Sequence, residues 1–253
     1  MHLECRCSPI GFSRMKEKHV FFDLDRTLWD FETNSELTLQ HLFEHLQLNR
    51  HIAEFDQFLE VYKRENALLW KAYGLNQVSK SYLRNKRFER TLAVFSIDNN
   101  QLVEQMSDGY IELSPKQKAL HENAFETLDL LQNDGYQMHI VTNGFKEVQH
   151  TKLKESGLTP YFKTVICSEE IGKNKPSPEI FHYAMKQANA NAKDSVMIGD
   201  DFEADVIGAL NAGMHAIHYL PNASQLGSQE DSCTISNLNQ LPALLHRILR
   251  DRL

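Results

Sequence analysis

The sequence predicts an α/β fold: a doubly wound parallel sheet with helices on both faces and an all-helical bundle inserted after the first strand. Two observations lead to this prediction. Short apolar runs alternate with amphipathic helical segments, and the runs are apolar at both alternating positions, as in strands buried on both faces. Residues 31–113 interrupt this alternation with helical patterns alone.

Local signals place the individual elements. We expect strands at 19–23, 136–142, 163–168, 194–200 and 215–220. Helical spacing is present over 115–134, 146–156, 177–190 and 203–212. Glycine, a favoured residue after a helix, follows three of these segments at Gly135, Gly157 and Gly213. Composition predicts a surface loop at 221–232 and a closing helix at 241–253.

The inserted segment is predicted to form four amphipathic helices. Thr33 with Glu36, and Asp98 with Gln101, match the capping box that opens a helix, so the first and fourth helices are expected to begin there. The expected organisation is therefore an N-terminal extension at 1–18, a core made of 19–30 and 114–253, and a helical cap at 31–113.

Composition narrows the class of protein. The 253 residues carry a formal net charge of −7, which argues against binding a nucleic-acid polymer. Apolar runs are too short to span a membrane, and the N-terminus lacks the apolar core of a signal peptide. Four cysteines are too few for a disulfide framework, so we expect a cytoplasmic protein, and a monomer by default.

Polar residues follow four of the expected strands. The carboxyl ends of parallel strands meet at one edge of a sheet, where ligands bind, so these residues are expected to converge. In chain order they are Asp23, Asp25, Thr142, Asn143, Lys175, Asp200 and Asp205.

Several carboxylates in one cleft need a compensating cation, and Mg²⁺ suits oxygen ligands together with phosphate oxygens. Asp23, next to the rigid strand, is suited to attack phosphorus and form an aspartyl-phosphate. Asp25 can protonate the leaving oxygen and then deprotonate the attacking water. Lys175 supplies a fixed positive charge for a phosphate. The sequence therefore predicts a Mg²⁺-dependent hydrolase of phosphate monoesters acting on small phosphorylated metabolites.

These motifs resemble those of the haloacid dehalogenase superfamily of phosphohydrolases, over about residues 19 to 220. The matching stretches are Asp-Leu-Asp-Arg-Thr at 23–27, Thr142, Lys175-Pro176, and Gly-Asp-Asp-Phe-Glu-Ala-Asp at 199–205. The resemblance implies a helical cap inserted after the first strand. Glycine is the commoner family residue where this chain has Arg26, which alters the local turn but removes no reactive group.

The resemblance also implies roles for individual residues. Mg²⁺ would be held by Asp23, the backbone carbonyl of Asp25, and Asp200, with Asp205 supporting the metal shell. The phosphate would be held by Thr142, Asn143 and Lys175.

A narrower resemblance is to house-cleaning nucleotidases that hydrolyse pyrimidine 5′-nucleotides. It rests on "ALLWKAY", "RFERTL", "IVTNGF" and "SEEIGKNKPSPEIFHYA". Trp70 and Arg87 in the cap are candidates for substrate specificity. The alternative for these two is that Trp70 belongs to the core of the bundle and Arg87 is a surface charge.

Other functions remain open at this point. A sugar-phosphate phosphatase or a phosphomutase would use the same core residues. A 2-haloacid dehalogenase needs neither Mg²⁺ nor Asp25. A non-catalytic phosphoacceptor, such as a receiver domain, also clusters carboxylates near Mg²⁺, but it is about half this length and has no insertion after its first strand.

Overall fold

The fold is taken from a computed structural model that describes residues 17–221 and 233–250. Most of the predicted N-terminal extension and of the predicted loop at 221–232 lies outside these residues. The strands are β1 (His19–Phe22), β2 (Gln137–Thr142), β3 (Phe162–Cys167), β4 (Ser195–Gly199), β5 (His215–Tyr219) and β6 (Thr234–Ile235). The first five match the predicted strands to within one residue at each end, and β6 was not predicted.

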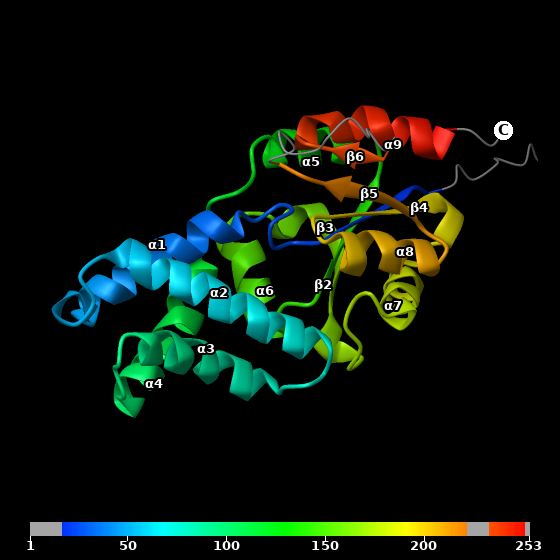
Figure 1. Cartoon of the computed structure of the whole chain (residues 1–253). Helices are drawn as coiled ribbons and strands as arrows, with labels where there is room; N and C mark the ends of the chain where they lie inside the picture. The colour runs from blue at the N-terminus through cyan, green and yellow to red at the C-terminus, as the bar shows by residue number, and fades with distance from the viewer. Residues whose placement is uncertain (1–16, 222–232, 251–253) are drawn as a thin grey trace, which may run out of the picture.

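The strands form one sheet in the order β3-β2-β1-β4-β5-β6, and neighbouring strands pair in parallel. The first strand therefore lies in the middle, between β2 and β4 (Figure 1). This arrangement confirms the predicted fold class. It also brings the residues that follow β1, β2 and β4 next to one another in space.

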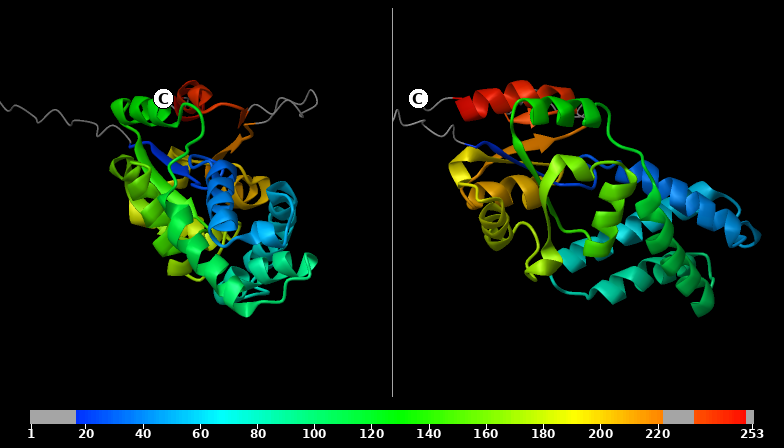
Figure 2. Two further views of the ribbon diagram at one scale, coloured as in Figure 1. Left: turned by 90° about the vertical axis from the view of Figure 1, so that its left-hand side faces the viewer. Right: turned by 180° about the vertical axis from the view of Figure 1, so that it is seen from behind.

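Helices cover both faces of the sheet (Figure 2). Side chains of β1 alternate between the faces: Val20 and Phe22 pack in one apolar cluster, and Phe21 packs in another. The first cluster includes residues of α5 (Ala124–Asn133) and α9 (Leu241–Arg250). The second includes residues of α7 (Pro178–Ala188) and α8 (Gly208–Asn211). The remaining helix of the core is α6 (Lys146–Glu155), directly after β2.

The inserted helices pack around an apolar core of their own and lie at one end of the sheet (Figures 1 and 2). They are α1 (Phe31–His45), α2 (Phe55–Gly74), α3 (Lys80–Val94) and α4 (Asn100–Leu113). Tyr62, Phe88 and Tyr110 join three of them through ring contacts with centroids 5.3 to 5.9 Å apart. Burial of a large apolar side chain of this kind contributes about 1.5–3 kcal/mol to the free energy of folding.

Both predicted capping boxes are wrong about where the helix begins. The N-cap of α1 is Asp30, whose carboxylate accepts a hydrogen bond from the Thr33 amide at 3.0 Å. The N-cap of α4 is Asn99, whose side chain accepts from the Leu102 amide at 3.1 Å. In each case another Asp or Asn nearby satisfies the free amides of the first turn, as strong N-cap residues do.

The helix expected over 115–134 begins only at Ala124. The residues before it, which lead from the cap back to the core, form hydrogen bonds with the chain segment that leads from the core into the cap. The Asn34 side chain donates to the Ala119 carbonyl (2.8 Å) and accepts from the Ala119 amide (2.9 Å). The Asp30 amide donates to the same carbonyl, at 3.1 Å. Backbone groups used in this way are unavailable to a helix.

Within the described parts of the chain, no helix combines the length and the apolar character that crossing a bilayer requires.

Candidate active site

The carboxyl edge of the sheet brings together predicted site residues from four segments of the chain. Asp23 directly follows β1, Thr142 ends β2, Asp200 directly follows β4, and Lys175 lies in the loop between β3 and α7. The sheet order places these strand ends side by side, as expected for ligand sites in open parallel sheets.

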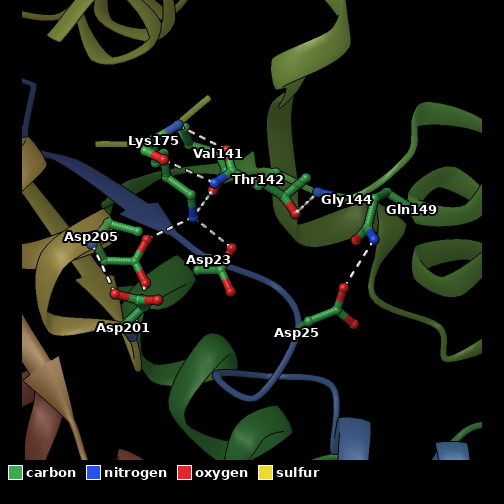
Figure 3. A network of polar contacts seen from close by, with 11 residues as sticks. Asp23, Asp25, Val141, Thr142, Gly144, Gln149, Lys175, Asp201 and Asp205 are labelled. Carbon is green, nitrogen blue, oxygen red and sulfur yellow. Dashed lines mark hydrogen bonds and ion pairs between the residues drawn. The ribbon is translucent and has the colours of Figure 1, made fainter. Parts of the chain in front are cut away.

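Lys175 is the centre of this arrangement (Figure 3). Its ammonium group donates to Asp23 Oδ1 at 2.7 Å, to Asp205 Oδ1 at 2.6 Å and to the Val141 carbonyl at 2.9 Å. Its side chain is only 3% exposed. Burial alone would lower the pKa of Lys175, but Asp205 and Asp23 raise the pKa overall, so the side chain is held as a cation.

Three carboxylates converge around this one lysine. Asp23, Asp200 and Asp205 each place an oxygen within 4.8 Å of the other two. Burial, opposed by Lys175 and reinforced by the neighbouring carboxylates, raises the pKa of Asp23 well above its usual value. Burial and repulsion from Asp205 raise the pKa of Asp200 to about 7. The cluster therefore carries more carboxylates than its lysine can neutralise.

A hard divalent cation fits this donor set. The oxygens come from three carboxylates of one cluster, and Mg²⁺ prefers carboxylate oxygens and waters. Gly199 allows the Asp205 carboxylate to lie close to the end of β4, because a Cβ on this residue would lie 2.1 Å from Asp205 Oδ2. Asp205 is also fixed from behind by the Asp201 amide, which donates to Oδ2 at 3.1 Å. The excess negative charge is thus held in a fixed geometry.

Asp25 points away from this cluster (Figure 3). Its carboxylate forms an ion pair with the buried Lys152 and accepts a hydrogen bond from Gln149 Nε2 at 3.0 Å. Lys152 also lies over the Trp29 ring, 4.0 Å from the centroid. Gly144 leaves room for the amide, because a Cβ there would lie 1.9 Å from Gln149 Nε2.

Sequence reasoning missed Gln149 and Lys152. They lie one turn apart on α6, so they share a face of that helix, but helical spacing does not say which loop the face will meet. Their partner Asp25 is more than 120 positions earlier in the chain.

The side chains of Thr142 and Asn143 both form hydrogen bonds to the protein backbone. Thr142 Oγ1 accepts from the Gly144 amide at 3.0 Å. The Asn143 side chain accepts from the Lys175 amide at 2.8 Å and donates to the Lys175 carbonyl at 3.1 Å. Asn143 therefore fixes the backbone that carries the central lysine, and its side-chain amide is occupied.

Arg26, where the sequence departs from the commoner glycine, has a φ of 65°. This left-handed conformation costs little for glycine and more for other residues, which explains the preference for glycine. The Arg26 side chain lies over the Phe31 ring, 4.2 Å from the centroid, and pairs with Glu32 at 2.9 Å. Arg26 thus keeps the turn that presents Asp25.

A family model described as haloacid dehalogenase-like hydrolase matches residues 20–219. The chain belongs to this hydrolase family. The pyrimidine 5′-nucleotidase PynA of Streptococcus pneumoniae is 31% identical over 207 residues, which is 81% of this chain and 84% of that protein. The pyrimidine 5′-nucleotidase YjjG of Escherichia coli is 31% identical over 235 residues, which is 91% of this chain and 99% of that protein.

A solved structure agrees with this assignment. The HAD-hydrolase YfnB of Bacillus subtilis, in a crystal form bound to magnesium, superposes with a TM-score of 0.78 at 27% sequence identity. The match covers 93% of this chain and all of the other.

The two predicted specificity residues of the hydrolase, Trp70 and Arg87, line the same cavity between cap and core. The enclosed part of this cavity is about 40 Å³, and the rest is open to solvent. Asp25 lines it from the core. Trp70 stacks on Phe145, with ring centroids 5.3 Å apart, and so contributes to the contact between cap and core. Arg87 is buried, so the alternative of a surface charge is wrong.

Proposed function

We propose that this hydrolase is a Mg²⁺-dependent phosphatase that acts on nucleoside 5′-monophosphates of the pyrimidine class through an aspartyl-phosphate. The observation that carries the proposal is the cluster of Asp23, Asp200 and Asp205 around a single lysine. The similarity to the pyrimidine 5′-nucleotidases PynA and YjjG supports the substrate class, and the cavity beside Asp25, which opens to solvent, supports a binding place for the leaving group.

The residues that would hold the ion are Asp23, the backbone carbonyl of Asp25, and Asp200, with Asp205 behind them. When bound, Mg²⁺ offsets carboxylate charge and polarises phosphate oxygens. Lys175 carries a positive charge at the centre of this cluster. It would therefore also attract the negative charge of an incoming phosphate. The Thr142 hydroxyl and the amides after β2 would donate to the remaining phosphate oxygens.

In the proposed reaction, Asp23 attacks phosphorus in line and forms a new P–O bond while the bond to the leaving oxygen breaks. Asp25 takes up a proton in the substrate complex and donates it to that leaving oxygen. Asp25 then takes a proton from water, which attacks phosphorus, releases phosphate and restores the Asp23 carboxylate. Lys152 and Gln149 support this proposal because they hold the Asp25 carboxylate at the wall of the cavity where the leaving group would lie.

Release of inorganic phosphate from a panel of phosphate monoesters tests the proposal. We expect turnover of pyrimidine monophosphates with Mg²⁺ and its loss with EDTA. Asp23→Asn keeps the shape of the side chain but removes the nucleophile, so we expect at least about a 10⁴-fold loss in kcat.

The matched control is Asp201→Asn in the same cluster of loops. Asp201 is exposed and caps the helical segment after β4 by accepting from the Ala204 amide, a role that asparagine also fills. We expect its activity to stay within about twofold of the parent. Absence of phosphate release from every substrate would refute the proposed function. Full activity of Asp23→Asn would refute the assigned nucleophile.

A further inference from the structure

Arg87 is a buried cation whose hydrogen-bonding capacity is largely unused. The residue lies on α3 and is 3% exposed. Among the described residues only Nη1 has partners, and both contacts are long: 3.4 Å to Tyr62 Oη and 3.5 Å to Asn66 Oδ1. Nε and Nη2 are buried and make no hydrogen bond to any part of the chain that the structure describes. These two nitrogens form one edge of the guanidinium plane, so a complete edge is free.

Within residues 17–221 and 233–250, Arg87 forms no ion pair with a carboxylate. Its Cζ lies 4.4 Å from the ring centroid of Tyr110 and 5.0 Å from that of Phe88. Ring faces attract a cation but cannot accept two in-plane hydrogen bonds. Burying unpaired charged donors costs free energy, and such groups persist where a ligand completes them.

The cavity lined by Arg87 gives the position of that ligand. Its walls include Trp70 and Tyr110 from the cap, and Phe145 and Asp25 from the core. A leaving group whose oxygen lies at Asp25 would therefore extend between aromatic side chains toward Arg87. Such walls suit a flat ring, and the free Nε–Nη2 edge suits two adjacent acceptor atoms in the plane of that ring.

We infer that Arg87 is a specificity-determining residue that binds a pair of adjacent, coplanar acceptor atoms on the leaving group, such as the 2-carbonyl oxygen and N3 of cytosine. The inference rests on the proposed phosphatase function and narrows its substrate class. A carboxylate on the leaving group presents the same pair of acceptors, so the test separates these two sources. A leaving group without acceptors gains nothing from Arg87.

The test compares Arg87→Met and Arg87→Lys with the parent on three substrates: cytidine 5′-monophosphate, 6-phosphogluconate and phenyl phosphate. For the substrate that carries the recognised acceptor pair, we expect Arg87→Met to lower kcat/KM by about tenfold to a hundredfold, as for lost charge-assisted hydrogen bonds. Arg87→Lys keeps the charge but lacks the planar guanidinium group, so its kcat/KM should be nearly as low as that of Arg87→Met. For phenyl phosphate, kcat/KM of both variants should differ from that of the parent by less than about threefold.

A single-atom change in the substrate sharpens the test. In 3-deazacytidine 5′-monophosphate a C–H replaces N3, so the parent should turn it over about tenfold less efficiently than the natural nucleotide. With Arg87→Met that difference should largely disappear. Arg90→Met is the matched control, since Arg90 lies on the same helix with a side chain 43% exposed, and its kinetics should match those of the parent.

The outcomes separate the two proposals. An equal loss on all three substrates, phenyl phosphate included, would mean a structural role for Arg87 and would overturn the inference. Unchanged kinetics of Arg87→Met on both acceptor-bearing substrates would overturn it as well, while leaving the phosphatase intact. If no substrate is hydrolysed, the binding of cytidine can still be measured by calorimetry, because binding needs no turnover. Binding that is lost in Arg87→Met would support the site even if no substrate were hydrolysed.

Discussion

Lys175 in the core and Arg87 in the cap are both buried cations, but their surroundings are opposite. Lys175 contacts two carboxylates directly and has a third, Asp200, in the same cluster. Arg87 forms no ion pair among the described residues and lies against aromatic rings. The core side of the site thus has an excess of negative charge, and the cap side an excess of positive charge.

The difference shows what each side lacks. A cluster of carboxylates with too few cations is completed by a metal ion, and a guanidinium with a free edge is completed by acceptor atoms. Lys152 is the intermediate case, because it has one carboxylate, Asp25, and the pair needs no further ion.

Lys175→Met should have the largest effect on stability. It leaves buried carboxylates without their cation, so we expect the free energy of unfolding in EDTA to fall by about 3–5 kcal/mol. Urea denaturation followed by circular dichroism measures this loss. Lys173→Met, at an exposed site in the same loop, is the control. Equal stability of the two variants would show that Lys175 does not balance the cluster.

The metal-free protein should also lose stability as pH rises, because the pKa of Asp200 moves from 3.8 to about 7 on folding. Between these values the folded state holds a proton that the unfolded state has lost, so the free energy of unfolding falls with increasing pH. The full shift corresponds to at most about 4 kcal/mol, and we expect nearer 2 kcal/mol because Asp200 is partly exposed.

Denaturation in EDTA at pH 4 to 8 measures this term as the difference between the parent and Asp200→Asn. The variant should gain stability relative to the parent across that range, and Mg²⁺ should remove the parent's disadvantage at pH 8. A difference that is flat with pH would contradict the assigned pKa shift.

Lys152→Met tests the intermediate case. Without Lys152 the Asp25 carboxylate is less well fixed at the cavity wall, so we expect kcat for phosphate release to fall about tenfold with KM nearly unchanged. Stabilisation by Mg²⁺ should persist, since Lys152 is outside the metal cluster. Lys154→Met, exposed on the same helix, should behave like the parent. A raised KM with unchanged kcat would mean that Lys152 binds substrate instead.

Arg87→Met should have the smallest effect on stability, in contrast to Lys175→Met. No carboxylate loses its partner, and methionine fits among aromatic rings, so the free energy of unfolding without ligand should change by less than about 1 kcal/mol or increase. Thermal and urea denaturation beside Arg90→Met measure the change. A loss as large as that of Lys175→Met would show that Arg87 has a charge partner in the folded protein.

Much of the fold followed from local pattern. Runs apolar on both sides marked the first five strands to within one residue, and helical spacing found the four cap helices. The helix starts at Asp30 and Asn99 were missed because several Asp, Asn and Thr residues there can each cap a helix. The two-residue β6 carries too little pattern to be recognised, and only its pairing with β5 makes it a strand.

The sequence by itself determined which residues stand at the carboxyl edge of the sheet, because each of them ends a strand or lies in the connection that follows one. The tertiary structure alone decided how charge is shared among them. In the folded protein, Asp25 forms an ion pair with Lys152, and Asn143 fixes the backbone of Lys175. The Nε–Nη2 edge of Arg87 has no hydrogen-bond partner among the described residues. Chain order sets neighbours along a strand, whereas electrostatic balance depends on groups that meet only when distant segments pack.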